Sequence, residues 1–280
     1  MKKIVSIVIM IALMAVCFCS CGGNNTTAKV VDINLTEEDY AFGVDKSQPE
    51  LLAAVNELIK GMKEDGSLEE LCNKYFSNGT PTPVTSATLD PSKDQLVVAT
   101  NAAFEPFEYT EGDKYLGIDM EIAAMLAQKL GKELVIQNMD FDAVCLTVGQ
   151  QKCDIAMAGL TVSEDRKEFV TFSDSYYAAS QKLIVKEGDT TFAECKTAAD
   201  VEAILKNLPA DTKIGVQQGT TGQLYVEGDA DWGFDGYDVK CVTYKNGSLA
   251  VQDMLNGNID FVIIDAAPAD CIVEAINEVR

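Results

Sequence analysis

The stretch KVVDINLTEEDYAFGVDKSQPELL, residues 29–52, contains two strand patterns that come before any sheet they could join. The first pattern is VVDI at residues 30–33, and the second is YAFGV at residues 40–44. Their β-branched and aromatic side chains are typical of strands, and a strand needs neighbours for its backbone N–H and C=O groups. This stretch therefore raises the question of which sheet takes its first strand.

Two predicted helices and a linker follow these strands. Residues 47–50, SQPE, and residues 67–70, SLEE, each have the spacing of a capping box, in which a serine and a glutamate close the helix N-terminus. Apolar residues then recur on one face of each helix, over residues 51–62 and 71–76. Residues 79–94, GTPTPVTSATLDPSKD, are rich in proline, threonine and serine, so we expect an extended and poorly packed linker.

Strand and helix patterns alternate from Leu96 to the C-terminus. The first series starts with the strand LVVAT at 96–100 and includes the helix IDMEIAAMLAQKL at 118–130. The second series starts with LIVK at 183–186 and ends with a helix at 267–278. Such alternation indicates an α/β fold with mostly parallel sheets, and the presence of two series predicts two lobes.

Each end of the chain lacks a neighbouring element that the other end could supply. The C-terminal helix ADCIVEAINEVR, residues 269–280, is not followed by a strand that returns to the sheet, and the strand at 30–33 is not preceded by a helix. We therefore expect the N-terminal strand to join the sheet that the C-terminal residues build.

The first residues have the pattern of a secretory signal, because two lysines precede an apolar run over residues 4–18. The run is short for a membrane-spanning helix, and polar residues follow it, so a retained transmembrane anchor is the less favoured alternative. FCSC at residues 18–21 resembles a bacterial lipobox, which implies cleavage after residue 20 and diacylation of Cys21, with Cys17 as a second candidate. Residues 21–28 would then tether the protein to the outer face of the cell membrane.

Composition excludes several classes of function. The formal net charge of −22 repels nucleic acid and anionic lipid surfaces. The chain contains no histidine, which excludes His-based catalytic triads and the usual histidine-containing zinc sites. No C-x-x-C pair occurs beyond the signal, so we expect free thiols and no metal site. The cysteines concerned are Cys72, Cys145, Cys153, Cys195, Cys241 and Cys271.

A series of motifs follows in one order along the alternating region: ATNAAFEPFEY, GIDMEIAAMLAQKLG, AGLTVSEDR with FSDSYY, VQQGTTG and DFVIIDAAPA. In this order they closely resemble the family 3 extracellular solute-binding proteins, which serve polar amino-acid ABC importers. The similarity runs from Leu96 to Arg280, and AGLTVSEDR with FSDSYY is its most specific part. It implies a two-lobed α/β fold of the type II periplasmic-binding-protein kind, with a hinge between the lobes.

In that family, a segment similar to residues 29–78 normally comes last, whereas here it comes first. The resemblance therefore implies a circular permutation, in which residues 79–94 join the family's usual C- and N-termini. A tandem fusion of two shortened copies and a domain-swapped dimer are the alternatives. The expected parts are a signal peptide at 1–20, a lipid tether at 21–28, lobe 2 at 29–36 and 182–280, lobe 1 at 42–180, and hinges near 37–41 and 178–181.

A free amino acid presents a carboxylate, an ammonium and a side chain, so its site needs a cation, an anion and an adaptable wall. On spacing alone, Arg166 within the acidic segment 164–168 favours a surface ion pair. The resemblance implies instead that Arg166 holds the ligand carboxylate by two parallel hydrogen bonds, assisted by Thr161. GTTG by itself indicates an ordinary turn. The further contacts that the resemblance implies are Ala158, Gly159, Gly219, Thr220 and Thr221.

Asp265 ends the apolar strand FVIID, and α/β proteins bind ligands at the carboxyl ends of parallel strands. The resemblance implies that Asp265 pairs with the ligand ammonium, while its position also suits an N-cap for the following helix. Phe104 and Phe141 are implied to form apolar walls, with core packing as the alternative for each. Asn101 stands where many relatives carry aspartate, which disfavours a strongly cationic ligand, although the nearby Glu105 could restore that preference.

These features predict a binding protein rather than an enzyme. We expect a lipid-anchored monomer that uses no cofactor, closes its lobes on a free amino acid and delivers it to an ABC permease in the membrane. Two alternatives stay open. The same fold occurs in cyclohexadienyl dehydratases, for which Glu105 is the candidate general acid, and a lipid-anchored amino-acid sensor would share the same sequence features.

Overall fold

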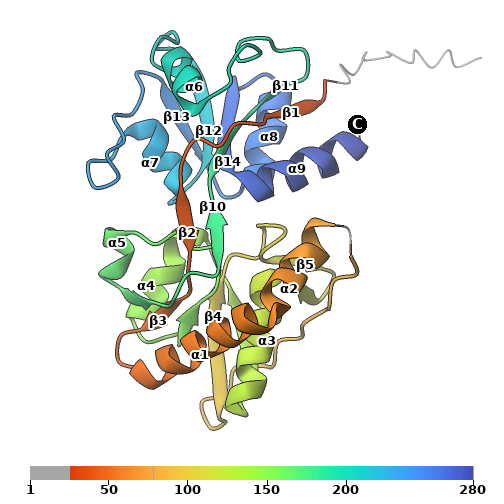
Figure 1. The fold of residues 1–280 in the computed structure, drawn as a ribbon, viewed down its shortest axis with the longest axis vertical. Helices are drawn as coiled ribbons and strands as arrows, with labels where there is room; N and C mark the ends of the chain where they lie inside the picture. The colour runs from red at the N-terminus through yellow and green to blue at the C-terminus, as the bar shows by residue number, and fades with distance from the viewer. Residues whose placement is uncertain (1–25, 78, 280) are drawn as a thin grey trace, which may run out of the picture.

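The computed structural model describes residues 26–77 and 79–279, and it shows two α/β lobes joined by a narrow hinge (Figure 1). Each lobe contains one five-stranded mixed sheet, and the hinge is a ribbon of two strands, β2 and β10. Within the described residues, no helix has the length and apolar character needed to cross a membrane. The predicted signal peptide and Cys21 lie outside the described residues.

Lobe 1 is built around a sheet with the strand order β7-β4-β8-β3-β9. Strand β4 is parallel to both of its neighbours, whereas β3 is antiparallel to β8 and β9. The elements of this lobe are β3 (Gly43–Asp45), α1 (Pro49–Asp65), α2 (Ser67–Phe76), β4 (Gln95–Thr100), β5 (Tyr109–Glu111), β6 (Lys114–Leu116), α3 (Ile118–Leu130), β7 (Glu133–Asn138), a 3-10 turn (Phe141–Ala143), α4 (Val144–Gly149), β8 (Ile155–Ala156), α5 (Glu164–Lys167) and β9 (Val170–Phe172).

Lobe 2 is built around a sheet with the strand order β1-β11-β14-β12-β13. The predicted parallel strands β12, β13 and β14 form one half of it, and β11 runs antiparallel to both β14 and β1. The elements of this lobe are β1 (Ala28–Val31), β11 (Gln181–Lys186), α6 (Ala198–Leu205), β12 (Lys213–Gln217), α7 (Thr221–Glu227), β13 (Lys240–Tyr244), α8 (Gly247–Leu255), β14 (Phe261–Asp265) and α9 (Ala266–Glu278).

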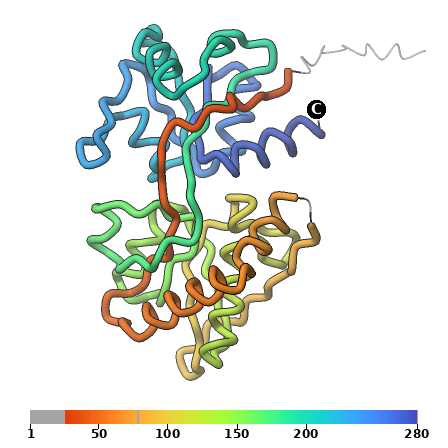
Figure 2. The backbone as a smooth tube through the Cα atoms, in the orientation of Figure 1, coloured from red at the N-terminus to blue at the C-terminus, as the bar shows by residue number. Residues whose placement is uncertain are grey.

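The N-terminal segment contributes one strand to each sheet and one to the hinge. Val31 of β1 lies opposite Leu183 of β11, and Leu183 in turn lies opposite Ile263 of β14. The opening strand therefore does lie in the sheet of the C-terminal residues. In the hinge, β2 (Glu38–Tyr40) pairs antiparallel with β10 (Tyr177–Ala179), and the two crossings run side by side in Figure 2. Ala28, which we expected in the tether, is a buried residue of β1.

Helices α1 and α2 form as predicted, but their N-termini lack the predicted side-chain caps. Leu51, Val55 and Ile59 of α1 are buried against the core of lobe 1. The predicted capping boxes are absent from both helices. The hydroxyl of Ser47 donates to the Asp45 carboxylate instead, and Ser67 lies inside α2, where its backbone N–H donates to Asp65. Neither helix N-terminus therefore has a side-chain cap, and each serine contacts an aspartate two residues before it.

The linker at residues 79–94 is more closely packed than its composition predicts. Val84 is buried and exchanges two backbone hydrogen bonds with Tyr115. The hydroxyl of Ser86 accepts a bond from the Ile136 N–H at 2.8 Å, and Glu121 accepts bonds from both the Thr82 N–H and the Tyr75 hydroxyl. The linker therefore follows the surface of lobe 1 along a defined path.

Candidate functional site

The predicted ligand residues come from loops at the carboxyl ends of strands, where the two lobes face each other. Asn101 follows β4, residues 158–161 follow β8, residues 219–221 follow β12, and Asp265 ends β14. Most of these residues are buried in the structure. The β-strand ends of both sheets thus converge on the space between the lobes, as expected for an α/β ligand site.

Arg166 reaches across the boundary between the lobes. Its Nη1 donates to the Thr161 carbonyl at 2.7 Å, and its Nη2 donates to the Gly219 carbonyl of lobe 2 at 2.9 Å. The guanidinium also lies over the Phe141 ring, 5.2 Å from the centroid. The neighbouring Glu164 pairs with Lys167 at 2.6 Å. Arg166 therefore faces the interlobe space, and a surface ion pair with Glu164 is not what positions it.

Asp265 occupies the N-cap position of α9, but its side chain makes no capping bond there. Its Oδ1 accepts a hydrogen bond of 2.6 Å from the Tyr40 hydroxyl. Burial, and then the nearby Glu38 carboxylate, raise the pKa of Asp265 to about 7. The carboxylate is therefore turned toward the hinge and away from the first turn of the helix, which disfavours the N-cap alternative.

Glu38 is a buried carboxylate of the site that the sequence analysis missed. Its Oε2 accepts a bond of 2.7 Å from the Thr161 hydroxyl, and its Oε1 accepts bonds from the Thr36 hydroxyl at 2.6 Å and from Gln181 at 3.0 Å. The residue lies in β2, which we had assigned only a hinge role. An acidic residue two positions before a buried tyrosine in a short strand was the available signal.

Phe104 and Tyr40 enclose Gly159 from two sides. Gly159 has a φ of +54°, and a Cβ atom there would lie 2.8 Å from the Phe104 ring and 3.4 Å from the Tyr40 ring. Its N–H donates to the carboxylate of Asp119, which the Tyr176 hydroxyl also contacts. Glycine is therefore needed here for both its backbone conformation and its lack of a side chain. Phe104 is buried, whereas Phe141 is only half-buried.

Asn101 pairs across the lobes with Gln217, a second residue that the sequence analysis missed. The Gln217 side-chain amide donates to Asn101 Oδ1 at 3.2 Å, and the Asn101 amide donates to the Met139 carbonyl at 2.6 Å. Gln217 Oε1 is buried and has no partner in the described chain. Gln217 ends β12 immediately before the GTTG turn, so its position in the motif was the available signal.

The GTTG turn uses part of its hydrogen-bonding capacity internally. The Gly219 N–H donates to the Gln223 side chain at 2.8 Å, and the Thr220 hydroxyl donates to the Gln217 carbonyl at 2.7 Å. Thr220 and Thr221 are both buried. The Gly219 N–H and the Thr220 hydroxyl are therefore engaged within the turn itself.

The lobes are also in contact through side chains outside the hinge ribbon. Gln218 of lobe 2 donates to Asp142 of lobe 1 at 2.8 Å, and Lys245 of lobe 2 pairs with Asp140 of lobe 1 at 3.1 Å. Together with the bond from Arg166 to Gly219, these contacts define a closed arrangement of the two lobes. The predicted ligand residues of both lobes thus lie along this interlobe boundary, and we call this group of residues the ligand site.

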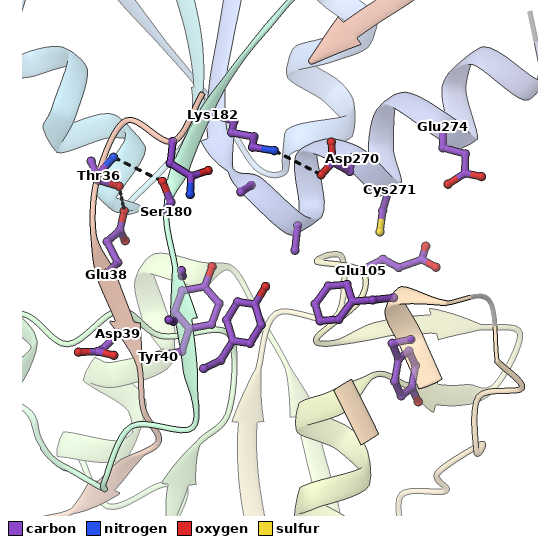
Figure 3. A pocket seen from close by; sticks show the side chains of 18 of the residues that line it. Thr36, Glu38, Asp39, Tyr40, Glu105, Ser180, Lys182, Asp270, Cys271 and Glu274 are labelled. Atoms are coloured by element: carbon purple, nitrogen blue, oxygen red, sulfur yellow. Dashed lines mark hydrogen bonds and ion pairs between the residues drawn. The ribbon is translucent and has the colours of Figure 1, made fainter. Parts of the chain in front are cut away.

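Two further carboxylates, Glu108 and Glu105, differ in their relation to the ligand site. Glu108 is fully buried, and neither of its oxygens has a partner within the described residues. Burial first, and then the Asp119 and Asp265 carboxylates, hold the pKa of Glu108 well above its usual value. Glu105, the candidate general acid, is not brought together with Arg166. It lines a different hollow between the lobes, together with Glu274 of α9 (Figure 3).

The fold and this site define a two-lobed α/β solute-binding protein. The chain belongs to the bacterial extracellular solute-binding proteins, family 3, whose model matches residues 96–256. It is 32% identical over 178 residues to the arginine-binding extracellular protein ArtP of Bacillus subtilis (strain 168), covering 64% of each chain. It is 26% identical over 223 residues to the L-cystine-binding protein TcyJ of Escherichia coli (strain K12), covering 79% of this chain and 72% of that one.

Solved structures show the same relationship. An ancestral arginine-binding protein bound to arginine superposes with a TM-score of 0.55 at 34% sequence identity, over 65% of this chain and 75% of that one. The ancestral amino acid-binding protein AncCDT-1, a precursor of cyclohexadienyl dehydratase, superposes with a TM-score of 0.55 at 28% identity. The chain spans 64% of the length of the Bacillus relative and 63% of an arginine-binding periplasmic protein of Mannheimia haemolytica.

Proposed function

We propose that this protein is the substrate-binding component of an ABC importer, anchored by lipid at Cys21, which captures a free amino acid between its lobes and delivers it to a membrane permease. Membership of family 3 and the amino-acid-binding relatives support a solute-binding role. The observation that supports the proposal is a series of contacts that links Arg166 of lobe 1 to Asp265 of lobe 2: Arg166 donates to Thr161, Thr161 pairs with Tyr40, and the Tyr40 hydroxyl donates to Asp265.

In this mechanism, each end of the ligand is satisfied by a different lobe. The guanidinium of Arg166 has five N–H donors, so it retains donors for a ligand carboxylate beside its bonds to Thr161 and Gly219. Asp265 receives the ligand ammonium in place of, or beside, the Tyr40 hydroxyl. A ligand that contacts both lobes stabilises the closed arrangement relative to the open one, and the β2–β10 ribbon absorbs the rotation. The permease then recognises the closed form.

We further propose that the chain is a circular permutation of the family fold. In support, the family match begins at residue 96, and the preceding segment supplies β1 to one sheet and β3 to the other. The packed linker at 79–94 spans the surface of lobe 1 between α2 and β4, as a connection between former termini would. One copy of each segment is enough to complete both lobes, which favours permutation over a tandem fusion.

A thermal-shift screen of the twenty amino acids tests the proposed function. A ligand that binds only the folded protein raises its melting temperature by mass action, so we expect one or a few amino acids to raise the Tm in a concentration-dependent manner. Isothermal titration then gives the affinity and stoichiometry. If none of the twenty changes the Tm or releases heat, the proposed amino-acid-binding function is wrong.

A further inference from the structure

A second hollow lies between the lobes beside the hinge ribbon, with a volume of about 1100 Å³. We call it the α9 groove, because residues along α9 form one wall, including Asp270, Cys271 and Glu274. Residues of lobe 1 also line it, among them Phe76 of α2. Glu105 of lobe 1 lies across from α9 (Figure 3). Within the described residues, none of the residues predicted to bind the amino acid lines this groove. It borders the ligand site at Glu38 and Tyr40, which line the groove and also contact Thr161 and Asp265.

The groove is strongly acidic. Among the described residues that line it, Lys182 is the single basic side chain, and it already pairs with Asp32 at 2.8 Å. Partial desolvation, and then Glu274 of the opposite lobe, raise the pKa of Glu105. Carboxylates from the two lobes therefore repel each other across the groove, and a cationic occupant would relieve this repulsion. The acidic lining residues are Glu37, Glu38, Asp39, Glu105, Asp270, Glu274 and Glu278.

The groove is long and has an aromatic wall. Lining residues occur along α9 from Ala266 to Glu278, and a helix of this length extends for about 18–20 Å. The Phe76 ring is 43% exposed and stacks on Tyr177 at 5.8 Å. Exposed aromatic faces attract cations as well as apolar side chains.

One strand of the hinge presents a free edge to the groove. Residues 177–179 of β10 all line it, and β10 pairs with β2 alone within the described chain. In Figure 1, the side of β10 that faces away from β2 opens toward α9. An unpaired strand edge can accept an extended segment as an additional strand, with main-chain bonds supplying affinity and side-chain pockets supplying specificity. This feature is independent of the charge of the groove.

We propose that the α9 groove docks an extended basic segment of a partner protein, which adds to β10 as a third strand and places lysine or arginine side chains against the acidic walls. Charge complementarity and the free strand edge both favour this occupant over a small cation. The segment contacts both lobes, so its binding is coupled to the angle between them. The proposal does not depend on which amino acid, if any, binds at the ligand site.

The test uses two acetylated and amidated hexapeptides, KLKLKL and ELELEL, with the full chain. We expect labelled KLKLKL to bind in fluorescence anisotropy, with an affinity that falls as salt is added, and ELELEL not to bind. Hydrogen exchange should slow at the amide of Ala178, whose partner in the register, Asp39, bonds to Val162 on the other side of β2, so that Ala178 faces the free edge. In a Glu105→Gln/Glu274→Gln variant, which removes one charge from each wall, the affinity should fall at least fivefold.

A matched control variant also removes one carboxylate charge from each lobe, but at positions outside the groove. Glu64 of lobe 1 and Glu187 of lobe 2 are exposed and do not line the groove, so Glu64→Gln/Glu187→Gln should bind KLKLKL like the unmodified protein. An equal loss in this control, or no binding of KLKLKL to the unmodified protein, overturns the proposal. If KLKLKL slows hydrogen exchange elsewhere in the protein but not in β10, the strand-addition geometry is wrong. Displacement of KLKLKL by equimolar spermine identifies a small polycation as the occupant and overturns the peptide proposal.

Discussion

The Tyr40 hydroxyl donates a 2.6 Å hydrogen bond to Oδ1 of Asp265, although 225 residues separate the two in the sequence. Tyr40 belongs to the hinge strand β2 in the N-terminal segment, and Asp265 ends β14 near the C-terminus. Both side chains are buried where the lobes meet. The environment of Asp265 is therefore set by a segment that precedes the family match, and the site is complete only when that segment is in place.

Arg166→Ala should remove high-affinity amino-acid binding without unfolding the protein. The side chain is half-buried and makes bonds to the Thr161 and Gly219 carbonyls. Charge-assisted hydrogen bonds contribute about 1.5–3 kcal/mol each, so the loss of two to a ligand carboxylate weakens binding by roughly 100-fold or more. Arg166→Lys should restore only part of this affinity, because an ammonium cannot make the two parallel bonds. Calorimetry that gives an unchanged affinity for Arg166→Ala would remove Arg166 from the site.

Amino-acid binding should weaken as the pH falls below about 7. Burial and Glu38 raise the pKa of Asp265 to about 7, so below that pH its carboxyl is increasingly protonated in the unliganded closed form. The ligand ammonium favours the charged carboxylate, and binding must then expel a proton. We expect the affinity to fall by up to about tenfold per pH unit below 7, as measured by calorimetry between pH 8 and 5.5.

Two variants distinguish the contribution of Asp265 to the pH dependence of binding from that of Asp119. Burial also raises the pKa of Asp119 to about 7, and this residue bonds to the Gly159 N–H and the Tyr176 hydroxyl. Asp265→Asn should bind weakly at every pH and lose the dependence, whereas Asp119→Asn should retain it. A pH dependence that survives in Asp265→Asn contradicts the assignment.

Gly159→Ala should lower both stability and ligand affinity. The new Cβ atom would lie 2.8 Å from the ring of the buried Phe104, at a backbone φ of +54°. Gly112 provides a matched control, because its φ is +60° and a Cβ atom there meets nothing within 4 Å. Each alanine should cost about 1–2 kcal/mol through the left-handed conformation, measured by urea unfolding, but only Gly159→Ala should also weaken binding. Equal effects of both variants on affinity would show that the Phe104 contact is unimportant.

The order of strands and helices could be predicted closely from the sequence, because apolar periodicity and turn residues mark each element locally. The pairing of β1 with β11 could be expected as well, since each end of the chain had an unfilled position in a sheet. The packing of the linker was not predictable from its composition. Proline, threonine and serine indicate an extended backbone, but bonds such as the one from Ile136 to Ser86 depend on a surface that only the folded lobe provides.

The site could be predicted where a motif places a charged residue at a strand end, as for Arg166 and Asp265. Glu38 and Gln217 were missed because their roles depend on contacts between segments that are distant in the sequence. Glu38 is surrounded by partners at Thr36, Thr161 and Gln181, which come from three parts of the chain. The bond between Gln217 and Asn101 joins opposite lobes, so neither residue alone indicates it.

The N-terminal segment should be required for folding, and its position in the chain should not. A fragment of residues 95–280 lacks β1, β2, β3, α1 and α2, which leaves the lobe 1 strands β8 and β9 without their common partner. We expect this fragment to show no cooperative unfolding transition by circular dichroism. A rearranged chain, in which residues 26–78 follow residue 280 through a short flexible linker, should recover a cooperative transition and the ligand-induced rise in Tm. A fragment 95–280 that unfolds cooperatively and binds ligand by itself would contradict the proposed permutation, because the family fold would then be complete without residues 26–78.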